Sequence, residues 1–177
     1  KNLEGKTVLV VTNLDVPVKD AQVQNNFRIK QAVPTIKYLL EQGARVVVIS
    51  KLGRPGGEYD DSLSLMPVRF ELGKLLETHV KFAHVPTSRN SIIFMENGEV
   101  LLLENVRFHP EEESTKKAER KKFVEELAEL ADYYVNDAFA TYRPSASTVE
   151  LAEAFKNPVT GLLVEKEIEE LSKLEEP

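Results

Sequence analysis

The sequence predicts an α/β domain of three layers, in which helices cover both faces of a mostly parallel sheet. Short apolar, β-branched runs alternate along the chain with segments whose apolar residues recur at helical spacing. The runs at residues 7–12, 44–50 and 99–104 are apolar without alternation, a pattern typical of strands that are buried on both faces. Strand–helix–strand order of this kind indicates a parallel sheet between helical layers.

The remaining elements follow from the same periodicities. Further strands are expected at residues 80–83, 133–136 and 159–164, and helices at residues 34–42, 66–78, 116–131, 147–155 and 165–174. The helix at 116–131 has the clearest apolar stripe, through Phe123, Leu127 and Leu130. Pro67 suits the first turn of its helix.

Length and composition restrict the class of protein. A chain of 177 residues fits one domain of ordinary size, and the absence of cysteine excludes disulfides and thiolate metal sites. The net charge of −6 argues against a general nucleic-acid partner. No apolar run approaches the roughly 20 residues that span a bilayer, and the first residues lack the apolar core of a signal peptide. We expect a cytoplasmic monomer that contacts neither nucleic acid nor membrane.

Arginine recurs at the expected strand ends. Arg54, Arg107 and Arg143 each follow a strand, and Arg28 lies at the head of a helix. Ligands of parallel sheets bind beyond the carboxyl ends of the strands, and the planar guanidinium group matches carboxylate and phosphate oxygens. The pattern favours a crevice for a small, highly anionic ligand, although surface arginines are common enough that chance placement stays an alternative.

Several motifs of other site types are missing from the sequence. There is no G-x-x-x-x-G-K-[ST], no G-x-G-x-x-G and no H-E-x-x-H, so neither a nucleotide loop nor a metal site is expected. The glycines of residues 53–57 mark a turn more often than a phosphate cradle. We expect Asp137 to cap a loop, and residues 111–122, which mix both charges, to form a loop and a solvated helix face.

Four segments resemble the phosphoglycerate kinase family, in the family's order. Residues 28–36 (RIKQAVPTI) resemble R-I-x-A-A-x-P-T-I, and residues 50–55 (SKLGRP) resemble S-H-L-G-R-P. Residues 101–108 (LLLENVRF) and 135–139 (VNDAF) match the family strings outright. The resemblance runs over residues 6–177 and implies the fold of the family's N-terminal domain, a three-layer α/β/α unit with a Rossmann-like sheet.

The resemblance also implies a function and a division of the chain. In the family, the N-terminal domain binds 3-phosphoglycerate, the C-terminal domain binds Mg-ATP or Mg-ADP, and the two close for the phosphoryl transfer of glycolysis. Residues 1–164 would form the N-terminal domain and residues 165–177 the start of the interdomain helix. We expect the C-terminal nucleotide-binding domain, a partner in the family, to be absent from this chain. The chain would then hold no cofactor and be inactive alone.

The family's site residues carry over in part. Arg28 resembles the catalytic arginine that stabilises the transferring phosphoryl group. Arg54 and Arg107 resemble ligands of the substrate phosphate, and Arg143 resembles another, more loosely because one residue near it is deleted. Phosphoryl transfer requires mainly that the reacting groups are positioned and that their negative charge is stabilised. Arginines can do both.

Other substrate-binding positions depart from the family. Where the family has R-V-D-F-N, this sequence has Val11, Asn13 and Asp15 in place of the arginine, aspartate and asparagine, and Lys51 replaces the histidine of S-H-L-G-R-P. Both histidines of A-H-R-A-H are missing as well. We therefore expect 3-phosphoglycerate to bind weakly or not at all at Asn13, Asp15 and Lys51. The alternatives are a non-catalytic pseudoenzyme or engineered scaffold that keeps only the fold, and a general phosphate-anion-binding module.

Overall fold

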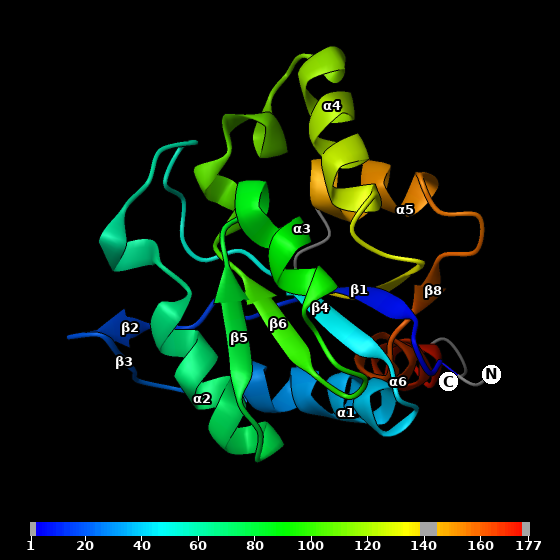
Figure 1. Ribbon diagram of the computed structural model, residues 1–177. Coiled ribbons are helices and arrows are strands. Elements are labelled where there is room, and N and C mark those ends of the chain that lie inside the picture. The colour runs from blue at the N-terminus through cyan, green and yellow to red at the C-terminus, as the bar shows by residue number, and fades with distance from the viewer. Residues whose placement is uncertain (1–2, 139–144, 175–177) are drawn as a thin grey trace.

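At the centre of the computed structural model, which describes residues 3–138 and 145–174, lies a six-stranded sheet (Figure 1). The strand order is β5-β6-β4-β1-β7-β8, and every neighbouring pair is parallel. The strands are β1 (Thr7–Thr12), β4 (Arg45–Ile49), β5 (Val80–Ala83), β6 (Val100–Leu103), β7 (Tyr133–Asp137) and β8 (Val159–Thr160). A separate antiparallel pair joins β2 (Val18–Lys19) to β3 (Gln22–Val23).

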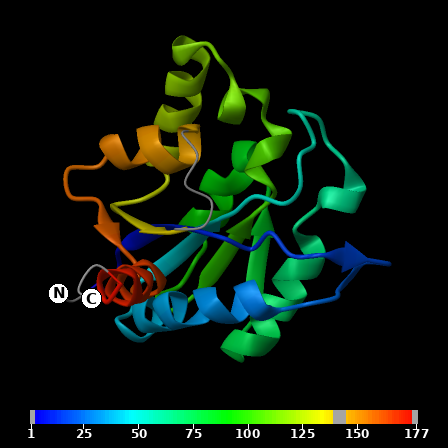
Figure 2. The same ribbon diagram turned by 180° about the vertical axis from the view of Figure 1, so that it is seen from behind.

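Helices cover both faces of the sheet, which confirms the three-layer prediction. One face carries α1 (Phe27–Glu41), α2 (Met66–Leu76) and α6 (Leu162–Ser172), and Figure 2 shows α6 beside α1. The other face carries α3 (Val85–Ile93), α4 (Lys117–Ala128) and α5 (Leu151–Glu153). Among the described residues, no helix has the length and apolar character needed to cross a membrane.

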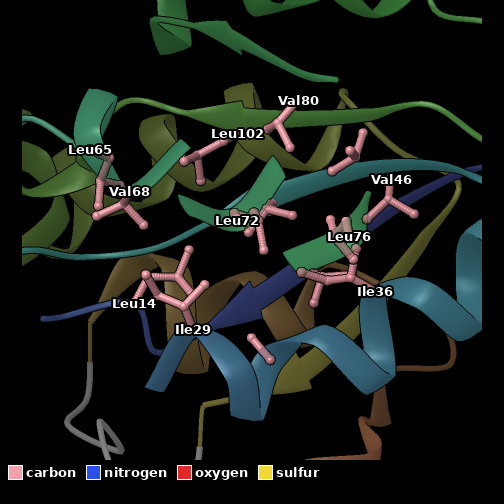
Figure 3. Packing of buried hydrophobic residues seen from close by; sticks show 14 of the residues in the cluster. Leu14, Ile29, Ile36, Val46, Leu65, Val68, Leu72, Leu76, Val80 and Leu102 are labelled. Atoms are coloured by element: carbon pink, nitrogen blue, oxygen red, sulfur yellow. The ribbon is translucent and has the colours of Figure 1, made fainter. Parts of the chain in front are cut away.

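The two layers of core explain why β1 is apolar without alternation. Successive side chains of a strand point to opposite faces. Val8 and Val10 therefore join the cluster under α1 and α2, whereas Leu9 and Val11 join the cluster under α3 and α4. Figure 3 shows the first cluster, in which Ile29 and Ile36 of α1 face Leu72 of α2 and the sheet.

Two expected elements differ in the structure. The strand expected at 159–164 is wrong beyond Thr160, because α6 already begins at Leu162. The helix expected at 34–42 begins earlier, at Phe27, and contains Pro34 in its interior. Two further elements were not predicted from the sequence. These are α3, whose residues VPTSRNSII carry no continuous apolar stripe, and the hairpin of β2 and β3.

The early start of α6 depends on groups from distant parts of the chain. The backbone N–H of Leu162 donates to Thr35 Oγ1 at 3.0 Å, and those of Leu163 and Val164 donate to Asp137 Oδ1 at 3.0 and 3.3 Å. These are N–H groups of a first helical turn, which have no partner within the helix. Asp137 thus has the structural capping role expected for it, although it caps a helix.

Candidate anion-binding site

The loops that follow β4 and β6 lie at the carboxyl edge of the sheet (Figure 1). Arg54 and Arg107 of these loops line a cleft. The cleft has a volume of about 480 Å³, within the range of small-molecule sites. Three arginines, two glutamates and two serines supply its polar lining: Arg54, Arg107, Arg120, Glu113, Glu150, Ser114 and Ser145. Two of the predicted arginines, Arg54 and Arg107, therefore lie together.

Buried hydrogen bonds of Asn105 hold the two loops in place. Its side-chain amide donates to Leu52 O at 2.7 Å, and its Oδ1 accepts from the N–H groups of Leu52 and Arg107, both at 3.2 Å. Asn105 is fully buried, so these bonds are shielded from competing water. The asparagine of the LLLENVRF segment thereby fixes the backbone that carries Arg107 against the loop that carries Arg54.

Arg107 is largely committed to the protein. Its Nε donates to Glu113 Oε1 at 2.8 Å, and its Nη1 donates to Gly53 O at 2.6 Å. Arg54 is exposed and has no hydrogen-bond or ion-pair partner within residues 3–138 and 145–174. Arg54 is thus the cleft arginine that is open to a ligand without any prior rearrangement.

Gly53 links the cleft to a neighbouring hollow of about 260 Å³, which Asp15 and Arg28 line. Its N–H donates to Asp15 Oδ1 at 3.1 Å, and the Arg28 Nη1 donates to Asp15 O at 2.6 Å. Gly53 has φ of +58°, and a Cβ there would lie 2.5 Å from Leu63 Cδ2. Because L side chains rarely adopt this backbone conformation, the loop requires glycine at this point.

Lys51 and Glu112 form a buried ion pair beside the cleft. The Lys51 Nζ lies 2.8 Å from Glu112 Oε1 and donates to Ser145 Oγ at 2.6 Å. The Glu112 carboxylate also accepts from the backbone N–H and the hydroxyl of Ser147, at 3.0 and 2.6 Å. The exposed fractions of the two side chains are 7% and 1%. The ammonium group predicted to bind substrate is therefore occupied by a carboxylate of the protein.

Asn13 also lies away from the cleft. It is buried, and its Oδ1 accepts from the Asp15 N–H at 3.1 Å. Together with Val11 and Lys51 it lines a cavity of about 10 Å³, room for roughly one water molecule. The predicted residues are thus divided among the cleft, the hollow and this small cavity. Arg143 lies outside the described residues.

Arg120 is a cleft residue that the sequence analysis missed. Its Nε donates to Glu150 Oε1 at 2.7 Å, and its Nη1 donates to Ser114 O at 2.6 Å. The expectation of a solvated helix face at 111–122 is wrong for this side chain. A signal was available, because Arg120 precedes the buried Phe123 and Val124 by three and four residues, and such neighbours share one helix face.

The phenol of Tyr134 stays neutral beside this network. Burial, and secondarily the charge of Glu112, raise the pKa of Tyr134 above its ordinary value. Its hydroxyl donates to Thr148 O at 3.1 Å. Within the part of the chain that the structure describes, no group of three or more His, Cys, Asp or Glu side chains could hold a metal ion.

Comparison with known proteins assigns the family. The family model described as phosphoglycerate kinase matches residues 1–177. The chain belongs to the phosphoglycerate kinase family. It is 44% identical over 176 residues to the phosphoglycerate kinase of Pelotomaculum thermopropionicum and 44% identical over 182 residues to that of Dictyoglomus turgidum. These matches cover 98% and 100% of the chain but 44% of each relative, so the chain spans less than half of either phosphoglycerate kinase.

Solved structures of the family agree with the fold. The phosphoglycerate kinase of Pyrococcus horikoshii OT3 superposes with a TM-score of 0.87 at 36% identity, over 98% of this chain and 44% of that one. The enzyme of Coxiella burnetii gives a TM-score of 0.84 at 37% identity, over 98% and 43%. The chain therefore has the fold of one part of a phosphoglycerate kinase, as the strand-end motifs predicted.

Proposed function

We propose that this domain is the 3-phosphoglycerate-binding half of a phosphoglycerate kinase and that its cleft binds the phosphate of 3-phosphoglycerate or 1,3-bisphosphoglycerate. One observation carries the proposal: Arg54, which is exposed and has no partner among the described residues, lines the same cleft as Arg107. A hydrogen bond to a charged group contributes about 1.5–3 kcal/mol. Millimolar binding corresponds to about 4 kcal/mol, which two or three such bonds from Arg54 and Arg107 would supply.

Catalysis would require a second domain. Phosphoryl transfer depends on positioning and charge stabilisation, and Arg28, in the hollow next to the cleft, would stabilise the transferring group. The sequence has no nucleotide loop, and the described residues contain no metal-binding cluster. The described residues thus offer neither a nucleotide loop nor a metal-binding cluster to hold Mg-ATP or Mg-ADP. We therefore assign the nucleotide to the second domain of the family and expect no turnover by this chain alone.

We expect the substrate to bind weakly, because the glycerate end lacks partners. Asn13 is buried, and its side-chain oxygen already accepts a hydrogen bond from the Asp15 N–H. Lys51 is paired with Glu112. Neither group is open to a ligand hydroxyl or carboxylate. Only the phosphate end would then contribute to affinity.

Isothermal titration with 3-phosphoglycerate at low ionic strength tests the proposal. Arg54→Ala should weaken binding about tenfold or more, since one lost charge-assisted bond has that effect. Arg89→Ala is the matched control, because Arg89 is a surface arginine paired with Glu129 on other elements. If both variants bind like the original protein, the cleft is not the substrate site.

A second candidate function is a non-catalytic relative that binds phosphate groups in general. The buried Lys51–Glu112 pair favours it, because this pair replaces a family substrate contact with an internal one. Inorganic phosphate and 3-phosphoglycerate should then bind with equal affinity. The variant Asp15→Asn removes a negative charge from the open hollow while its amide oxygen can still accept from the Gly53 N–H. It should raise affinity for 3-phosphoglycerate on the order of tenfold and leave that for phosphate unchanged. An equal response of both ligands would contradict the assignment of Asp15 to the glycerate end.

A further inference from the structure

The arginine cleft already contains carboxylates of the protein itself. Glu113 Oε1 lies 2.8 Å from Arg107 Nε, and Glu150 Oε1 lies 2.7 Å from Arg120 Nε. The cleft therefore combines three guanidinium groups with two carboxylates. Their formal charges sum to +1, which is far less positive than the arginines alone suggest.

The two carboxylates are held at the cleft by their ion pairs with its arginines, and their backbone adjoins the buried network. Glu113 directly follows Glu112, whose side chain is bound by Lys51 and Ser147. Glu150 lies one helical turn after Ser147, in the segment Ala146–Glu150. The Glu113 side chain is 50% exposed and that of Glu150 is 23% exposed, so each carboxylate can turn away from an arriving anion only by giving up its ion pair with Arg107 or Arg120. An anion that enters the cleft therefore meets both negative charges.

We infer that Glu113 and Glu150 are specificity-determining residues that restrict the cleft to a single phosphate group by repelling ligands of higher charge. The inference rests on the proposed function, in which the cleft binds phosphate. Repulsion between a carboxylate and an anionic ligand grows in proportion to the charge of the ligand. Arg54 and the N–H groups of Arg107 and Arg120 that face no carboxylate can hold one phosphate. A diphosphate brings more negative charge to the same two carboxylates and gains no further arginine.

The test uses inorganic phosphate and pyrophosphate as probes, at pH 8 and low salt without divalent metal. Glu113→Gln, Glu150→Gln and the double variant keep the side-chain shape and remove the charge. Each single substitution should tighten phosphate binding about fivefold and pyrophosphate binding about tenfold. The double variant should multiply these factors, so that the preference for phosphate over pyrophosphate declines.

Glu129→Gln is the matched control, because Glu129 also pairs with an arginine, Arg89, but on the surface outside the cleft. It should change neither affinity. Equal gains for both probes, or no gain in the double variant, would overturn the inference. Circular dichroism of each variant confirms that the fold is intact.

Arg54→Ala separates this inference from the proposed function. If Arg54→Ala weakens phosphate binding and the glutamine variants change nothing, the phosphate site stands and the role of the glutamates is wrong. If Arg54→Ala has no effect in any background, the proposed function is wrong and the inference with it. Absence of phosphate binding by both the original protein and the double variant overturns both.

Discussion

Two neighbouring glutamates of one turn form ion pairs of very different character. Glu112 pairs with Lys51 in the interior, with exposed fractions of 1% and 7%, whereas Glu113 pairs with Arg107 at the cleft, with exposed fractions of 50% and 15%. In the interior, each charge has lost its water and depends on its partner. At the cleft, water and salt screen the pair, so its contribution to stability is small. The same type of ion pair thus stabilises the fold in the interior and contributes little to stability at the cleft, where its charges face an entering ligand.

Removing one partner of the buried pair should have the largest effect on stability. Glu112→Ala leaves the Lys51 ammonium buried without a counter-charge, and we expect the free energy of unfolding to fall by about 3–5 kcal/mol. Glu113→Ala should reduce it by about 1 kcal/mol or less. Guanidinium chloride unfolding of the two variants measures both values. Equal losses would show that burial does not separate the two pairs.

A second comparison of buried and exposed positions uses two glycines. A Cβ at Gly161 would lie 2.2 Å from Asp137 Oδ1, at the start of α6, whereas a Cβ at Gly56 would meet nothing within 4 Å. Gly161→Ala should therefore cost about 2–3 kcal/mol through overpacking. Gly56→Ala should cost only about 1 kcal/mol, from its positive φ. Thermal unfolding distinguishes the two variants. If Gly161→Ala leaves the stability unchanged, the start of α6 is not fixed at Asp137.

Asp137 offers a test of a buried carboxylate that has no cationic partner among the described residues. Its Oδ2 is buried without a hydrogen bond, and burial raises the pKa of Asp137 above its ordinary value. The folded protein then binds this proton more tightly than the unfolded chain does. The contribution to stability is thus fully present below the unfolded pKa of about 3.9 and is lost as pH rises through the folded pKa.

Asp137→Asn should remove this dependence, because the amide oxygen can still accept from Leu163 and Val164. The variant should gain stability relative to the original protein as pH rises from about 4 to 7. Urea unfolding at several pH values gives the difference. A difference that stays constant with pH would mean that Asp137 titrates alike in both states.

A much smaller effect than that of Glu112→Ala is expected when the whole buried pair is replaced. Lys51→Met combined with Glu112→Leu removes both charges together, and such exchanges are often neutral or stabilising. We expect the free energy of unfolding of the double variant to lie within about 1–2 kcal/mol of the original, well above that of Glu112→Ala. A double variant as unstable as the single one would place the loss in the hydrogen bonds of Ser145 and Ser147.

The sequence by itself determined the α/β class, most element positions and the arginines at the strand ends. Each of these depends on local periodicity or on residues adjacent to a strand, as with Arg54 after β4 and Arg107 after β6. The role of Asn105 in the LLLENVRF segment was not predicted, because its bonds to Leu52 depend on a loop that the parallel sheet places beside it. Family resemblance rested on the same short segments.

Only the tertiary structure decided which charges meet. Lys51, Glu112 and Ser147 are far apart in the chain and share no repeat, so no pattern predicts that the lysine is neutralised inside the protein. The same holds for α6, whose first turn depends on Thr35 and Asp137. A polar side chain is used for binding or for structure according to the partner that folding brings to it, and that partner comes from a distant segment of the chain.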